Sequence, residues 1–281
     1  MNIRILTDST SDITNEQATK KNITVVPLRV SFGNEEYKDG ENLTSEQFYE
    51  KLKNTNKLPI TSQPSPEEFL LHFEDAKQKS DTVIVITLSS KLSGTYQSAL
   101  LAKNMCDYDN IYLVDSSTVT LGLKLLVDYA IILRDQGKSA EDIINILEKE
   151  KNNISVLAVV DTLEYLKKGG RLSSTAAFAG TLLNIKPIIK VKDGEVSMAA
   201  KARGTNSAFS KLKSLIDDNG SIAFDKPYTL GYTGDRHTLD PFLNFIESSY
   251  NLSNLPISTI GCTVGVHAGP GACGIAYFKA L

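Results

Sequence analysis

Serine and threonine side chains gather in loops between predicted strands and helices, where their hydroxyls could bind an anion. The clusters cover residues 7–12, 61–65, 89–95 and 115–118. In open α/β sheets, ligands bind beyond the carboxyl ends of the strands. Hydroxyls and free helix N–H groups there can hold an anion without a fixed cation. Each loop alone is equally typical of helix caps and turns, but several loops at one sheet edge favour a binding site.

Ser93 and His267 suggest a second chemistry, in which a base-activated serine attacks an acyl substrate. Ser93 does not lie in a G-x-S-x-G turn, and the sequence does not identify a carboxylate to orient the base. His267 precedes a glycine-rich loop, where it is either a neutral donor to a ligand or a structural histidine. We interpret His72, which falls inside a predicted helix, as structural.

The segment from Gly269 to Gly274 matches G-x-G-x-x-G letter by letter. A dinucleotide site requires this motif to follow a strand and open a helix. Here an apolar, strand-like segment follows it, so we expect these glycines to permit close backbone approach or positive φ. No H-x-x-x-H, C-x-x-C or clustered-carboxylate pattern is present either. We therefore expect neither a cofactor nor a metal.

The elements that would position these loops alternate in the first half of the chain. Strands are expected at residues 3–6, 83–88, 111–114 and 156–160. Helices lie between them, and two begin with capping-box patterns, Thr44 with Gln47 and Ser65 with Glu68. This alternation predicts βαβ units and a mostly parallel sheet.

The second half follows a different pattern. Residues 187–191 and 195–200 flank Asp193-Gly194, a sequence typical of a hairpin turn. Further strands are expected at 228–232, 257–263 and 274–278, with helices at 206–218 and 239–250. We therefore predict two domains: an α/β domain over residues 1–165, and an α+β domain with a mixed or antiparallel sheet over residues 166–281. A helix end with a glycine cap at residues 167–170 marks the boundary.

Composition excludes several classes of protein. The 281 residues carry a net charge of −3, which argues against a sequence-independent nucleic-acid binder. Uninterrupted apolar runs such as residues 83–86 are far shorter than the roughly 20 residues of a membrane span. Cys106, Cys262 and Cys273 are odd in number and lack metal-ligand spacing, so we expect thiols in a reducing compartment. We expect a cytoplasmic protein with at most transient membrane contact.

Six segments together resemble one known family, the DegV family of bacterial fatty-acid-binding proteins. They are TDSTSDI (7–13), TSQPS (61–65), SSKLSGTYQSA (89–99), GGR (169–171), KARG (201–204) and HAGPGACG (267–274). Each segment is weak alone, but six in the right order are specific, and the resemblance covers essentially the whole chain.

The resemblance implies two α/β domains with one long-chain fatty acid, such as palmitate or oleate, buried between them. It implies carboxylate contacts from Thr61, Ser93 and His267, with Ser62 and Gly94 at the same site. Such a carrier is not an enzyme, and in some members it presents its fatty acid to a separate kinase for phospholipid synthesis. Two alternatives stay open: a hydrolase or transferase with Ser93 as nucleophile, and an interaction module with an accidental pocket.

Two further assignments follow less directly. Four apolar residues could line the acyl tunnel, although core packing is the simpler explanation for each; they are Phe178, Leu182, Leu183 and Ile185. Arg203, at a predicted turn beside Lys201, either docks a partner such as the kinase or only solvates that turn.

Overall fold

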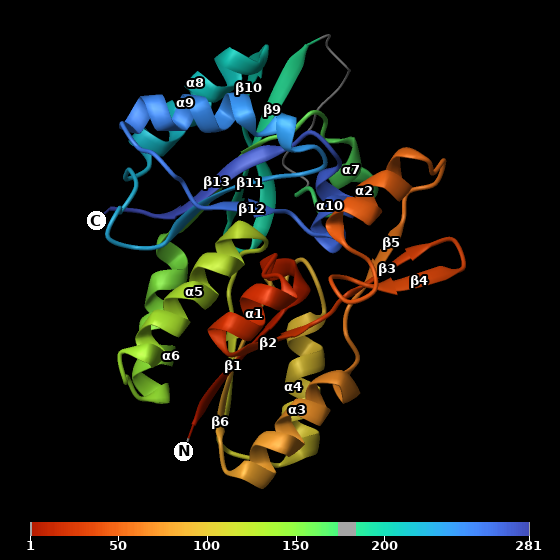
Figure 1. The fold of residues 1–281 in the computed structure, drawn as a ribbon, viewed down its shortest axis with the longest axis vertical. Helices are drawn as coiled ribbons and strands as arrows, with labels where there is room; N and C mark the ends of the chain where they lie inside the picture. Colours follow the sequence, from red (N-terminus) through yellow and green to blue (C-terminus); the bar gives the residue numbers. More distant parts are fainter. Residues whose placement is uncertain (1, 174–183, 281) are drawn as a thin grey trace.

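The computed structural model describes residues 2–173 and 184–280 (Figure 1). Its N-terminal part is built on a parallel sheet with strand order β2-β1-β6-β7. The strands are β1 (Ile3–Asp8), β2 (Ile23–Val26), β6 (Thr82–Thr87) and β7 (Ile111–Asp115). The predicted parallel sheet is therefore confirmed for these residues.

Helices cover both faces of this sheet (Figure 1). They are α1 (Asn15–Lys21), α3 (Pro66–Lys79), α4 (Thr95–Cys106), α5 (Leu121–Asp135) and α6 (Ala140–Glu150). The fully buried strand β6 shows why both faces need cover, because successive side chains of a strand point in opposite directions. Val83 and Val85 pack with α3 and α4, whereas Ile84 and Ile86 pack with α5 and α6.

The C-terminal part contains a six-stranded mixed sheet with order β10-β9-β8-β13-β11-β12. The strands are β8 (Ile154–Val159), β9 (Ile185–Lys192), β10 (Glu195–Arg203), β11 (Tyr228–Tyr232), β12 (Ile257–Thr259) and β13 (Cys273–Phe278). The predicted hairpin is confirmed: β9 and β10 are antiparallel, and Asp193 and Gly194 both have positive φ. Helices α8 (Thr205–Asp218) and α9 (Asp240–Tyr250) pack on one face of this sheet.

The strand predicted at residues 156–160 does not extend the parallel sheet. As β8 it pairs antiparallel with β13 and β9. The strand β7 is the edge of the parallel sheet, and the chain then runs through two successive helices, α5 and α6, to the other sheet. Helix α5 shares one apolar core with strands of both sheets. The boundary at residue 165 stays a prediction, but the hydrogen bonds of β8 join residues 154–159 to the C-terminal sheet.

The strand predicted at residues 257–263 is also wrong in its second half. Strand β12 ends at Thr259, and helix α10 (Cys262–Ala268) begins three residues later, with Gly261 as its N-cap. The first N–H groups of α10 bind carboxylates of Asp12 and Asp39, more than 200 residues away in sequence. Because this cap is not local, the sequence pattern around α10 could not reveal it.

A small antiparallel sheet, β4-β3-β5, lies beside α10 and was not predicted. Its strands are β3 (Arg29–Phe32), β4 (Glu35–Lys38) and β5 (Ile60–Ser62), accompanied by helices α2 (Ser45–Lys53) and α7 (Glu164–Lys168). Short 3-10 turns occupy Ser9–Ser11, Lys151–Asn153 and Arg236–Thr238.

All three cysteines are buried and free. Among the described residues, no helix combines the length and apolar character needed to cross a bilayer.

Candidate functional site

A cavity of about 390 Å³ lies between the parallel sheet and the six-stranded sheet. One wall comes from the loops that follow β1 and β6, and the opposite wall comes from β8 and β9. Strands β1 and β6 are neighbours, but the chain leaves β1 for β2 on one side before it returns to β6 on the other. A crevice forms at such a reversal of strand order, beyond the carboxyl ends of the strands. This topology brings the predicted loops at residues 7–12 and 89–95 together. Residues 61–63 reach the cavity from the small antiparallel sheet, and none of the residues predicted at 115–118 lines it.

Most of the cavity wall is aliphatic. The apolar side chains that line it are Leu28, Leu88, Leu92, Val119, Val156, Ala158, Val160, Leu166, Ile189, Val191, Val196, Ile260, Val264, Ala268 and Ala272. Ile185 lies at the start of β9, half-buried, and is not part of this wall. The other proposed lining residues, Phe178, Leu182 and Leu183, fall outside the described residues. The wall described here suits an alkyl chain, because it offers contact without competing polar groups.

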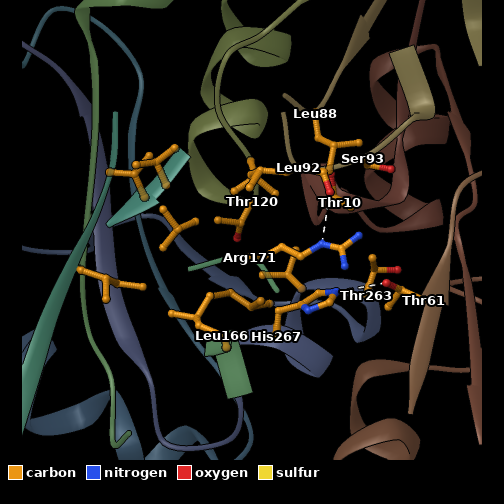
Figure 2. Close-up of a pocket in the computed structure, with 18 of the residues that line it drawn as sticks. Thr10, Thr61, Leu88, Leu92, Ser93, Thr120, Leu166, Arg171, Thr263 and His267 are labelled. Carbon is orange, nitrogen blue, oxygen red and sulfur yellow. Dashed lines mark hydrogen bonds between the residues drawn. The ribbon is translucent and has the colours of Figure 1, made fainter. Parts of the chain in front are cut away.

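Polar side chains gather at one end of the cavity (Figure 2). Thr61 Oγ1 and His267 Nε2 are 3.0 Å apart and share a hydrogen bond. Ser93 Oγ lies 2.9 Å from Thr95 Oγ1 at the start of α4. All five residues predicted for the site, Thr61, Ser62, Ser93, Gly94 and His267, line this cavity, although they come from three separate segments.

Arg171 also lines the polar end, and the sequence analysis did not assign it to the site. Its Nε donates to the Leu92 carbonyl at 3.2 Å, and Nη1 donates to the Gly169 carbonyl at 2.7 Å. These two bonds hold the guanidinium beside Thr61 and Ser93 (Figure 2). The Gly-Gly-Arg segment was the available signal, but the sequence analysis used it only as a part of the family resemblance and as a helix end, with no binding role for Arg171.

The environment of His267 keeps its ring neutral. Burial, and then the nearby charge of Arg171, lower the pKa of His267 to about 4. A neutral imidazole carries one donor and one acceptor nitrogen. Nδ1 has no hydrogen-bond partner in the described structure, and a Cβ at Gly169 would lie 2.2 Å from it. His267 can therefore donate one hydrogen bond to an anion without bringing a charge of its own.

Gly94 packs closely against the side-chain amide of Gln63. A Cβ at this position would lie 2.0 Å from Gln63 Oε1. The amide of Gln63 crosses the start of α4 and donates from Nε2 to Ser98 Oγ at 2.9 Å. The hydrogen bond from Gln63 to Ser98 ties the Thr61 segment to the start of α4, and the absence of a side chain at Gly94 leaves room for the Gln63 amide.

A buried carboxylate joins the two loops at the reversal of strand order. Asp8 accepts from the backbone N–H and hydroxyl of Thr10, at 3.0 and 2.6 Å, and from the Leu88 N–H at 2.8 Å. Burial raises the pKa of Asp8 to about 6. Asp8 thus holds the loops after β1 and β6 together at the edge of the cavity, in a structural role.

The geometry does not support a serine nucleophile. In the described structure the Ser93 hydroxyl is hydrogen-bonded to the Thr95 hydroxyl, and the His267 ring is hydrogen-bonded to the Thr61 hydroxyl. No hydrogen bond joins Ser93 to His267 among these residues, so the pair required for base activation is not formed.

The polar end of the cavity adjoins a second, outer cavity of about 370 Å³. Thr61, Arg171 and His267 line both. The outer cavity is also lined by Ile60, whose exposed fraction is 72%. The polar side chains therefore stand between an aliphatic interior and the protein surface.

Comparison with known proteins agrees with this arrangement. A family model described as an uncharacterised protein of the DegV family matches residues 2–280. The chain belongs to the DegV family. A DegV domain-containing protein of Caldanaerobacter subterraneus is 38% identical over 273 residues, which cover 97% of each chain.

Solved structures of DegV-family proteins share the whole fold. One from Thermus thermophilus, described by its fatty acid binding, has a TM-score of 0.90 and 32% identity, covering 99% of this chain and 100% of its own. One from Eubacterium ventriosum, described as a stearic acid-binding protein, has a TM-score of 0.89 and 30% identity, covering 99% of this chain and 98% of its own. The two-part α/β fold expected from the resemblance is thus confirmed.

Proposed function

We propose that this DegV-family chain binds one long-chain fatty acid in the aliphatic cavity and acts as a carrier, not as an enzyme. The observation that carries the proposal is a cavity whose wall is mostly aliphatic and whose hydroxyl, imidazole and guanidinium groups gather at one end (Figure 2). A fatty acid has the same division into one long apolar chain and one anionic group. The solved relatives described as fatty-acid-binding support the same ligand class.

The acyl chain supplies most of the binding free energy in this proposal. Burial of about 16 carbons contributes on the order of 12 kcal/mol gross, at ~0.8 kcal/mol per methylene. Each hydrogen bond to the carboxylate contributes roughly 1.5–3 kcal/mol. The aliphatic wall therefore retains the ligand, and the polar end decides which way it points.

The carboxylate is placed at the polar end. Thr61 and Ser93 supply hydroxyl donors, His267 supplies a neutral N–H, and Arg171 supplies the positive charge that a carboxylate favours. Thr263 adds a fifth group: its hydroxyl is 5% exposed, lines the cavity, and has no hydrogen-bond partner in the described structure. A carboxylate that accepts from these groups would satisfy them.

The carrier is further proposed to present its fatty acid to a cytoplasmic kinase that makes acyl phosphate for phospholipid synthesis. The outer cavity beside Thr61 and His267 gives a reagent a place to approach the carboxylate. Arg203 is exposed at the end of β10, where its guanidinium can reach an acidic or phosphate-bearing partner.

The ligand is tested by native mass spectrometry, and by gas chromatography of an organic extract, on protein purified from bacteria. We expect about one fatty acid per chain. Protein without lipid that also fails to bind added palmitate or oleate would refute the proposal. Turnover of ester substrates, blocked by a serine-reactive probe, would instead support the hydrolase.

A further inference from the structure

Helix α10 carries two of the groups that face the cavity. Thr263 and His267 are four residues apart, so they lie on the same side of the helix one turn from each other. Both point toward the polar end of the cavity, beside Thr61 (Figure 2). The position of α10 therefore determines how far the His267 ring stands from Thr61 and from a ligand.

Two carboxylates from the N-terminal part of the chain hold the first turn of α10. Asp39 accepts from the N–H groups of Cys262 and Thr263, at 3.1 and 2.9 Å. Asp12 accepts from the N–H of Gly261 at 2.8 Å. Helices leave these first N–H groups without internal partners, and negative charge is favourable there. Asp12 and Asp39 are only 8% and 5% exposed, so both carboxylates are largely buried against the start of α10.

Glycines let α10 pack closely against the groups that hold it. A Cβ at Gly261 would lie 3.1 Å from the Asp12 carboxylate and 3.4 Å from that of Asp39. A Cβ at Gly265 would lie 2.6 Å from the ring of Phe48 and 2.7 Å from the hydroxyl of Tyr49. The helix is thus packed closely against its neighbours, and its bonds to Asp12 and Asp39 set its place among them.

Asp12 reaches a second wall of the cavity. Its other carboxylate oxygen accepts from Thr120 Oγ1 at 2.5 Å, and Thr120 lines the cavity. The charged and titratable groups near Asp12 are Asp39, Lys124 and Tyr49. One buried carboxylate therefore connects the start of α10 to the loop before α5.

We propose that Asp39 and Asp12 are positioning residues, which fix α10 and thereby hold His267 and Thr263 against the carboxylate of the ligand. The proposal rests on the proposed function, because it assumes that a fatty acid carboxylate lies at the polar end. Neither the Asp12 nor the Asp39 carboxylate lines the aliphatic cavity itself, so both act on the ligand through α10.

The test is a double-mutant cycle in which palmitate affinity is measured for the wild type, Asp39→Asn, His267→Ala and the double variant. An amide at position 39 can accept only one of the two N–H bonds, so α10 should shift. We expect Asp39→Asn to weaken palmitate binding about five- to tenfold. If Asp39 acts through His267, adding Asp39→Asn to His267→Ala should weaken binding by less than about twofold more. The ring signals of His267 in NMR spectra should also move in Asp39→Asn.

Asp81→Asn is the matched control, because Asp81 also accepts from a backbone N–H, that of Asn2, and from Arg4. It lies just before β6, at the amino ends of the strands and away from the cavity. This variant should leave both palmitate affinity and the His267 signals unchanged. Gly261→Ala, a milder disturbance of the same contact, replaces Asp39→Asn if that variant does not fold. Asp12→Ala should weaken palmitate binding. Asp12→Asn should bind palmitate as the wild type does, because the amide oxygen can still accept from the Gly261 N–H and the Thr120 hydroxyl can accept from the amide N–H.

Additive effects of Asp39→Asn and His267→Ala, or unchanged affinity in Asp39→Asn, would overturn the inference. Wild-type protein that binds no palmitate would instead refute the proposed function, so the two failures are distinguishable.

Discussion

Replacement of Arg171 by Met should weaken fatty acid binding without unfolding the protein. Methionine keeps much of the side-chain volume but removes the cation beside Thr61 and Ser93 (Figure 2). The loss of one charge-assisted hydrogen bond to the carboxylate is roughly 1.5–3 kcal/mol, which corresponds to about a 10- to 150-fold increase in Kd. Isothermal titration with palmitate, at a temperature where both proteins are folded, measures this directly.

A second readout comes from His267. Burial is the larger cause of its lowered pKa and Arg171 is the smaller, so Arg171→Met should raise that pKa while leaving it below the ordinary value. NMR titration of the His267 ring tests the direction. Lys138→Met is the control, because it removes the same charge from an exposed loop between α5 and α6. Unchanged affinity in Arg171→Met, or equal effects of the two variants, would refute the placement of the carboxylate.

Three further predictions concern the binding groups, the buried carboxylate and the partner. Ser93→Ala and Thr61→Ala should each lose roughly 1–3 kcal/mol of binding free energy without unfolding the protein; if the double variant binds as tightly as wild type, the hydroxyls are only caps. Burial raises the pKa of Asp12 to about 7, so the native state holds a proton that the unfolded state releases above about pH 4. Stability should therefore fall as pH rises from about 4 to 7, by up to about 1.4 kcal/mol per pH unit from this group, and Asp12→Asn should remove that part of the slope in denaturant titrations. Arg203→Ala should leave the bound fatty acid unchanged and slow acyl-phosphate formation by the cognate kinase; loss of lipid would place Arg203 at the cavity, and full activity would show that it only solvates the turn.

Local patterns predicted the elements whose stabilising contacts are local. The Thr44–Gln47 capping box forms as expected, with the Gln47 N–H bonded to Thr44 Oγ1 and the Thr44 N–H bonded to Gln47 Oε1. The Asp193-Gly194 hairpin forms because both residues accept positive φ. The hydroxyl loops after β1 and β6 meet because these neighbouring parallel strands end on the same side of the sheet.

Features that depend on distant contacts were not predictable in this way. The sequence predicts a strand through the first two residues of helix α10, because the cap that begins this helix comes from the distant Asp12 and Asp39. Strand β8 was assigned to the parallel sheet, because its sequence cannot show which sheet it will join. Arg171 was overlooked because only the fold brings its guanidinium, fixed by the Leu92 and Gly169 carbonyls, to the polar end of the cavity.

The most direct test of the central claim is a crystal structure of the protein with palmitate. We expect one acyl chain along the aliphatic wall formed by β8, β9 and the loops after β1 and β6. The carboxylate should lie within hydrogen-bond distance of Thr61, Ser93 and His267, beside Arg171. A fatty acid bound with its carboxylate at the opposite end, or bound only outside this cavity, would contradict the account.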